Sequence, residues 1–205
     1  MAGKRDYTQG TTPKGSVLFA HVFTPETYEG KEVGYTIQLK LNEIDTKAFM
    51  AVIDEELEKA KHSIKLKPGQ KWSSEPFLGY REDKDGDIVF KFKTASSFTT
   101  KAGEEITRTI PVFDAHGKPI KEKINIGNGT IARVAYTLIP YWVSKVVNGI
   151  KLRLEAVQII DLNEYGEKEA KGYGFGDEEG GFSFEDTKDK EATPFDEAEE
   201  DEGDF

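Results

Sequence analysis

Strict alternation of apolar and polar side chains constrains the fold of this chain more than any other feature. The stretch VGYTIQLKL has an apolar residue at every second position, and DIVFKFKTASSF repeats the pattern. Such alternation is typical of a β-strand with one face in a core. The chain is therefore predicted to be mainly β, and the faces that we expect to be buried consist of Tyr35, Ile37, Leu39, Leu41, Ile88, Phe90 and Phe92.

A helical pattern occurs once, from about Asp45 to His62. Either Asp45 or Thr46 can cap its start, because both residue types accept hydrogen bonds from the first free amides of a helix. The apolar stripe of this helix is predicted to pack on the core and consists of Phe49, Val52, Ile53 and Leu57.

The second half of the chain predicts further strands and turns. A strand is expected to run into a turn at Asp114–Lys118, and a Gly-Asn-Gly loop at 127–129 precedes a long strand that ends at Pro140. Asn148-Gly149 is a hairpin signal, so we expect a last strand that pairs with the long one.

Five or more strands, mostly antiparallel, with a helix inserted after the second, fit a small closed or nearly closed barrel. The OB-fold, a five-stranded Greek-key barrel, is the best-known nucleic-acid-binding example. Another β-barrel or a sandwich has the same periodicity, and both remain open at this point.

Charge divides the chain into two parts. Residues 177–205 contain fourteen Asp or Glu and two Lys, whereas residues 1–176 carry a net charge of +2. A segment so acidic cannot bury enough apolar surface to fold alone. We therefore expect a folded domain at 1–176 and a disordered acidic C-terminal tail at 177–205, an asymmetry typical of a protein that meets a polyanion or a basic partner.

Several classes of protein are excluded or disfavoured. The chain has no cysteine, so it has no disulfide, thiolate catalyst or cysteine zinc site. No apolar run approaches the ~20 residues that span a membrane, and the start lacks the apolar stretch of a secretory signal. A cytosolic location without membrane attachment is expected.

The sequence offers no convincing catalytic or metal site. EDKDGD at 82–87 resembles a calcium loop, but Thr94 stands where an EF-hand needs its bidentate Glu, so a hairpin turn through Asp85-Gly86 is favoured. GNGTIA at 127–132 is followed by a strand, which excludes a dinucleotide fingerprint. The three histidines lie in no HExxH or triad pattern. No enzyme, metal or cofactor is predicted.

Basic residues alternate with aromatic ones along the predicted strands. Single-stranded nucleic acid needs this mixture, because cations neutralise phosphates and each stacked base contributes roughly 1–3 kcal/mol. Any one of these lysines could instead be a solvated surface residue, and some of the aromatics belong to the core. The candidate DNA-binding residues are Trp72, Phe77, Tyr80, Lys91, Lys93, Phe98, Arg133, Tyr141, Trp142, Lys145 and Arg153.

The acidic tail is a candidate competitor for the same cations. As a flexible coil its 29 residues span about 30 Å, and a body of this size has a radius of gyration of about 16 Å. Tethering then gives an effective concentration on the order of millimolar. The end of the tail, with an aromatic ring among carboxylates, also suits a basic, apolar pocket of a partner protein: Asp201, Glu202, Asp204 and Phe205.

The sequence resembles the single-stranded-DNA-binding proteins of short-tailed, T-seven-like bacteriophages. The resemblance is most specific over about 88–162, where the motifs FKFK, SSF, VFDAHGKPI, IGNGT, YTLIPYW and IKLRLEAVQIIDL occur in the family's order and spacing, and EDEGDF matches its acidic ending. It implies an OB-fold that binds single-stranded DNA without sequence specificity in replication, recombination and repair, protects strands and assists annealing.

The resemblance also implies particular residues and partners. The family's stacking tyrosine falls on Tyr141, its strand lysines on Lys91 and Lys93, and a basic residue near its N-terminus on Lys4. It implies that the tail contacts the phage DNA polymerase and helicase-primase in the cytoplasm of the infected bacterium, and that members can form homodimers. The chain departs from the family at Ala95, where an aromatic is expected, and at Ala135, where a basic residue is expected.

A second hypothesis from another class is an adaptor protein. In that case the acidic tail recruits a basic protein and the barrel is only a scaffold. If the folded domain without its tail did not bind single-stranded nucleic acid, the adaptor hypothesis would be favoured.

Overall fold

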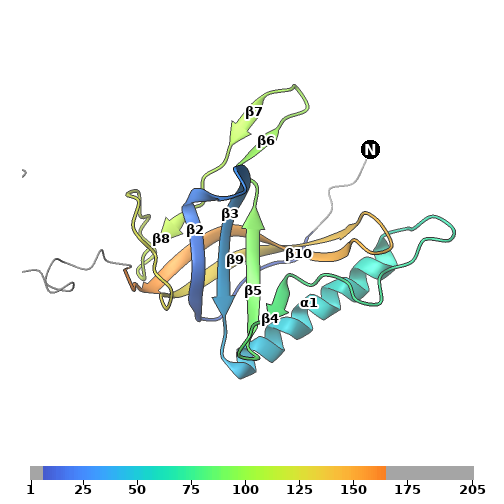
Figure 1. Ribbon diagram of the computed structural model, residues 1–205, viewed down its shortest axis with the longest axis horizontal. Coiled ribbons are helices and arrows are strands. Elements are labelled where there is room, and N and C mark those ends of the chain that lie inside the picture. The colour runs from blue at the N-terminus through green and yellow to red at the C-terminus, as the bar shows by residue number, and fades with distance from the viewer. Residues whose placement is uncertain (1–6, 165–205) are drawn as a thin grey trace, which may run out of the picture. The chain divides into compact units, whose positions relative to one another are not determined.

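The computed structural model describes residues 7–164, and these are mainly β with one helix (Figure 1). Lys4 and the whole acidic tail lie outside the described residues. The N-terminal elements are β1 (Gln9–Thr11), β2 (Gly15–Tyr28), β3 (Lys31–Lys40) and α1 (Glu43–Ser63). The middle of the chain forms β4 (Tyr80–Glu82), β5 (Ile88–Thr94), β6 (Ser97–Thr99), β7 (Glu105–Thr107) and β8 (Val112–Phe113). The last two strands are β9 (Ile131–Trp142) and β10 (Asn148–Asp161).

Five of these strands close into a barrel. β2 pairs with β3, β3 with β5, β5 with β10, β10 with β9, and β9 returns to β2. All of these pairings are antiparallel except that of β5 with β10, where Phe92 lies opposite Leu152. The closed ring excludes a sandwich and confirms the predicted OB-fold, with α1 inserted after the second barrel strand.

The predicted alternation of β3 and β5 is confirmed. Ile37, Leu39, Phe90 and Phe92 are all fully buried inside the barrel, and Phe49 of α1 packs on Phe90 with 4.8 Å between ring centroids. The helix therefore closes the core on one side. On the outer face, Thr36 and Gln38 of β3 are also buried, whereas Lys93 of β5 is exposed.

The helix differs from its sequence prediction at two points. It begins at Glu43 with Asn42 as N-cap, whose side chain accepts a 2.9 Å hydrogen bond from the Asp45 amide. The predicted cap at Asp45 or Thr46 was wrong because Asn42, one turn earlier, satisfies the first free amides. Val52 is 37 % exposed, so it lies at the edge of the stripe and outside the core.

The long strand does not end at Pro140, as predicted, but runs on to Trp142. The amide of Leu138 points away from β10 and donates a 2.8 Å hydrogen bond to the Thr8 carbonyl. The nitrogen of Pro140, two residues on, faces the same way, where β9 has no paired strand among the described residues. A proline costs no ladder hydrogen bond at such an edge position.

The hairpin between β9 and β10 is present, but its turn lies at 143–147 and not at Asn148-Gly149. Asn148 is 1 % exposed and already belongs to β10. Its side-chain amide donates to the carbonyls of Ser144 and Lys145 at 2.9 and 3.1 Å. Asn148 therefore braces the turn from inside instead of forming it.

The other predicted turns are confirmed. The amide of Asp83 donates to the Asp87 carbonyl at 2.8 Å around Asp85-Gly86, and that of Asp114 donates to the Lys118 carbonyl at 2.9 Å. Among the described residues, no helix combines the length and the apolar character that crossing a membrane requires.

Candidate nucleic-acid interface

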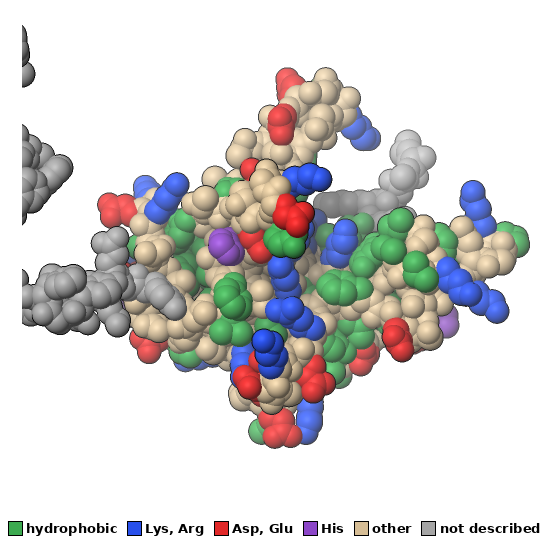
Figure 2. Space-filling model, viewed as in Figure 1, with side chains coloured by type: hydrophobic (Ala, Val, Ile, Leu, Met, Phe, Trp, Pro, Cys, Tyr) green, Lys and Arg blue, Asp and Glu red, His purple; other side chains and the backbone are tan. Residues whose placement is uncertain are grey.

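A basic groove lies on the outer face of the barrel, where β5 and β10 run side by side. Its cavity has a volume of about 370 Å³. Figure 2 shows a row of Lys and Arg side chains over the region of β3 and β5. We call this cavity the basic groove; it is lined by Phe77, Lys91, Lys93, Thr94, Ala95, Arg108, Ile139, Lys151, Leu152 and Arg153.

The pairing of β5 with β10 explains why the cations of the groove converge. Phe92 and Leu152 are buried partners across these parallel strands. Successive side chains of a strand point to opposite faces, so the neighbours of these two residues point outward together. Lys91 and Lys93 from β5 thus meet Lys151 and Arg153 from β10 over an apolar floor.

Two of the five cations are already paired with carboxylates. Lys91 Nζ lies 3.5 Å from Glu26 Oε2, and Arg153 Nε lies 2.5 Å from Glu155 Oε1. Within residues 7–164 the other three cations, Lys93, Arg108 and Lys151, form no salt bridge. These three are therefore the most available to a phosphate.

Glu26 holds Lys91 at the edge of the groove. Burial alone would raise the pKa of Glu26, but a hydrogen bond from Thr36 and the charge of Lys91 outweigh it, so the pKa is lowered. The Thr36 hydroxyl donates to Glu26 Oε2 at 2.8 Å. Because the folded pKa is depressed, the stability from this carboxylate is present above the ordinary pKa of 4.5 and is lost as pH falls through the lowered value.

Replacing Glu26 by Gln is expected to tighten the binding of single-stranded DNA, because Lys91 then no longer has to break its salt bridge with Glu26 before it contacts a phosphate. One additional available cation corresponds to about fivefold in affinity at about 0.1 M salt, from a slope of about 0.7 per contact. Anisotropy titrations at two salt concentrations measure both quantities. Weaker binding by a variant that melts like the wild type would show that Glu26 positions Lys91 for DNA instead of restraining it.

Aromatic side chains flank the basic groove at the β9–β10 end. Phe77 is 54 % exposed and lines both the groove and a neighbouring cleft of about 460 Å³, which Tyr80 and Tyr141 also line. Lys151 Nζ lies 4.9 Å from the centroid of the Tyr141 ring. Burial raises the pKa of Tyr141, so its phenol stays neutral and adds no negative charge beside the cations.

Gly149 fixes Phe77 at the mouth of the groove. The Phe77 amide donates to the Asn148 carbonyl at 2.9 Å, and the Ile150 amide donates to the Phe77 carbonyl at 2.7 Å. A Cβ on Gly149 would lie 1.8 Å from the Phe77 carbonyl oxygen, and its φ of +144° also favours glycine. The backbone can approach this closely only because position 149 has no side chain.

The β6–β7 hairpin contributes Arg108 to the groove. Its guanidinium lies 4.5 Å from the centroid of the Phe98 ring, and its Nη1 donates to Thr94 Oγ1 at 3.2 Å. Phe98 is 40 % exposed. A cation and an aromatic ring thus stand together at the opposite end of the groove from Tyr141.

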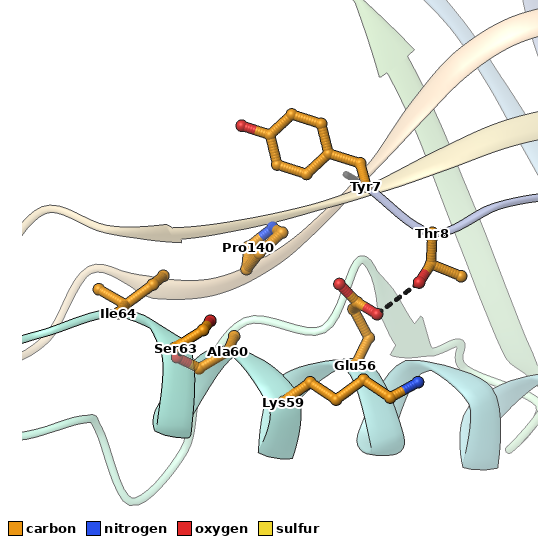
Figure 3. Close-up of a pocket in the computed structure, with 8 residues that line it drawn as sticks. All are labelled: Tyr7, Thr8, Glu56, Lys59, Ala60, Ser63, Ile64 and Pro140. Carbon is orange, nitrogen blue, oxygen red and sulfur yellow. Dashed lines mark hydrogen bonds between the residues drawn. The ribbon is translucent and has the colours of Figure 1, made fainter. Parts of the chain in front are cut away.

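A further cavity, of about 390 Å³, lies between α1 and the first described residues (Figure 3). There the Thr8 hydroxyl donates to Glu56 Oε2 at 2.7 Å, and Pro140 lines the opposite wall. Glu56 is 7 % exposed. Its contact with Thr8 ties the first described residues to the helix. Lys59 is the one cation among the residues that line this cavity, and it is paired with Glu55, whereas five cations line the basic groove.

Comparison with known proteins agrees with this geometry. The family model described as single-stranded DNA-binding protein, bacteriophage T7, matches residues 26–162. The chain belongs to this family. The single-stranded DNA-binding proteins of Enterobacteria phage T3 and Escherichia phage T7 are 36% and 34% identical to the chain over 91 residues. Each alignment covers 43% of this chain, and the chain spans only 39% of the length of either relative.

Solved structures share the fold at lower identity. The crystal structure of gp2.5, a single-stranded DNA-binding protein encoded by bacteriophage T7, superimposes with a TM-score of 0.65 at 24% identity, over 87% of this chain and 99% of that chain. The single-stranded DNA-binding protein of bacteriophage Enc34, in complex with single-stranded DNA, gives a TM-score of 0.52 at 16% identity, over 76% of this chain and 88% of that chain.

The structure brings together only some of the predicted DNA-binding residues. Lys91, Lys93, Arg153 and Phe77 line the basic groove, and Tyr141 lies beside it. Phe98 is linked to the groove through Arg108. For these residues the shared location supports the sequence-based assignment, which stays a prediction.

Other predicted residues lie elsewhere. Trp72 and Tyr80 are partly buried and pack on the core, although Tyr80 also lines the cleft beside Phe77 and Tyr141. Arg133 lines a separate cavity with Phe113 and Gln158, six positions before Ile139 on β9 and thus about 20 Å from the groove. Trp142 and Lys145 lie at the β9–β10 turn.

Sequence reasoning did not select Arg108. The signal that could have found it is Gly103, between two short alternating stretches, because a hairpin there returns the chain to the end of β5. The structure has this hairpin, with Phe98 opposite Ile106.

Proposed function

We propose that the chain binds single-stranded DNA without sequence preference in the basic groove. The observation that carries this proposal is the convergence of five cations on one apolar-floored groove, with exposed aromatic rings at its end. Membership of a family named for single-stranded DNA binding supports it, as does the DNA complex of the similarly folded phage protein.

The chemistry of the groove accounts for sequence tolerance. Lys93, Arg108 and Lys151 are the groove cations that form no salt bridge within residues 7–164. They would contact phosphates, which are the same in every nucleotide. Phe77 and Tyr141 would stack bases, and every base offers a ring face. The proposed activity is binding only, since the family and the curated relatives are named for binding.

The wider role is proposed in the same terms. In the cytoplasm of the infected bacterium, the protein would protect replication and recombination intermediates and assist annealing. The acidic segment 177–205 would compete with DNA for the groove and, once displaced, dock the phage DNA polymerase and helicase-primase through Asp201, Glu202, Asp204 and Phe205. Its fourteen carboxylates complement the groove cations, and a homodimer is a further proposal from the family resemblance.

The competition predicts that a version ending at Gly176 binds oligo-dT more tightly than the full chain. A tethered competitor at an effective concentration on the order of millimolar has to be displaced first, and salt weakens it. The gain should therefore be largest at low salt. Equal affinity of both forms at every salt concentration would contradict the competition, and absence of binding by both would favour the adaptor hypothesis.

A further inference from the structure

The two ends of the basic groove differ sharply in charge. The end formed by the β2–β3 turn and the β6–β7 hairpin is rich in carboxylates. Glu32 accepts a hydrogen bond from Ser96, and Glu105 accepts one from Ser97 at 2.7 Å. The carboxylates of this end are Glu26, Glu29, Glu32, Glu104 and Glu105, against the cations Lys31, Lys101 and Arg108. A polyanion that leaves the groove here meets net negative charge.

At the opposite end, the exposed Glu75 lines the cleft beside Phe77 and Tyr141, but the charge around it is net positive. That end consists of residues 64–74, which follow α1, and residues 142–148 around the β9–β10 turn, and we call these two segments the basic lobe. They contain four Lys and no Asp or Glu. Figure 2 shows basic and hydrophobic side chains gathered where these segments lie in Figure 1. Lys65, Lys67, Lys71 and Lys145 are all exposed, and within the described chain none of them forms a salt bridge.

Two hydrogen bonds join the basic lobe to the aromatic end of the groove. Trp142 Nε1 donates to the Lys71 carbonyl at 3.2 Å, and the Ser73 amide donates to Asn148 Oδ1 at 3.1 Å. Trp142 directly follows Tyr141, so the lobe begins where the stacking residues end. Val143 and Val146 are 69 % and 81 % exposed on its surface and offer bases an apolar contact.

We propose that the basic lobe is a second phosphate-binding region, over which a single strand continues after it has passed Phe77 and Tyr141. The strand would leave the groove on this side because the other side is acidic. Lys65, Lys67 and Lys71 are then DNA contacts. This inference rests on the proposed function and deepens it, since it sets the length of strand that one protein covers and the direction in which the strand leaves.

The test compares a short and a long oligo-dT, of about four and about sixteen nucleotides, which bracket the range that one OB-fold covers. The protein is the full chain with Lys65, Lys67 and Lys71 replaced by Ala. A matched control replaces Lys118, Lys121 and Lys123, three exposed lysines between β8 and β9. Both variants lose the same charge, and thermal melting establishes that both are folded.

The lobe variant is expected to bind the long strand roughly ten- to a hundredfold more weakly at about 0.1 M salt, with a log–log salt slope smaller by about 2, from about 0.7 per phosphate contact. It should bind the short strand within about twofold of the wild type, and the control should bind both strands normally. If the wild type bound both strands and the lobe variant bound them equally well, the inference would be overturned and the proposed function would stand. A wild type that bound neither strand would refute the proposed function itself.

Discussion

Replacing Lys93, Arg108 and Lys151 together by Ala is expected to weaken binding of oligo-dT about a hundredfold at about 0.1 M salt, because each lost phosphate contact costs about fivefold. These are the three groove cations without a salt bridge among the described residues, so their removal leaves no buried carboxylate unpaired. The log–log salt slope should become smaller by about 2. Anisotropy titrations over a range of salt concentrations measure both effects.

The control for this variant is again the replacement of Lys118, Lys121 and Lys123, which removes the same charge outside the groove. If both triple variants weakened binding equally, binding would depend on the total positive charge of the protein and not on the groove. A melting temperature unchanged from the wild type would ensure that the loss belongs to binding.

Replacing Gly149 by Ala is expected to lower the free energy of unfolding by about 3 kcal/mol or more, since strain and overpacking act together. The new methyl group would lie 1.8 Å from the Phe77 carbonyl oxygen, so the segment that carries Phe77 has to move away. Two hydrogen bonds between this segment and β10 would then be lost or distorted. Chemical denaturation measures the change, and DNA affinity should fall with it because Phe77 leaves the groove.

Gly30 provides the matched control for Gly149. Its φ is +73°, but a Cβ there would meet no atom within 4 Å. Gly30→Ala therefore tests the conformational cost alone, which is about 1–2 kcal/mol. Equal destabilisation by the two substitutions would mean that Phe77 is not held against Gly149 in solution.

The barrel was predictable because its strands carry their own pattern. Alternation placed Ile37, Leu39, Phe90 and Phe92 inside and Lys91 and Lys93 outside, and the structure agrees. Those predictions held because a period of two leaves only one way to bury the apolar face.

The errors arose where one residue type has two uses. Asn148-Gly149 has the composition of a turn, yet Asn148 braces the turn from within β10 and Gly149 admits the Phe77 backbone. Pro140 usually ends a strand, but at an unpaired edge it does not. Local sequence does not determine these two features. The role of Gly149 depends on the distant segment that carries Phe77, and the edge position of Pro140 depends on where β1 stops pairing with β9.

The candidate site was predictable only in part for the same reason. Lys91, Lys93 and Arg153 could be selected from strand faces, whereas the pairing of Lys91 with Glu26 joins residues 65 positions apart. Arg108 enters the groove through a hairpin of which neither strand exceeds three residues. An alternating pattern of only three residues is too short to identify a strand from sequence.

The central claim is that single-stranded DNA lies in the basic groove and is held there largely through its phosphates. The most direct measurement is an equilibrium titration of fluorescent oligo-dT with the full chain over a range of salt concentrations. We predict a linear log–log plot with a slope of about −2 to −4 for the groove alone, which corresponds to three to five phosphate contacts at about 0.7 each, and a steeper slope for a strand long enough to reach the basic lobe. Binding that did not depend on salt, or no binding at any salt concentration, would contradict the account.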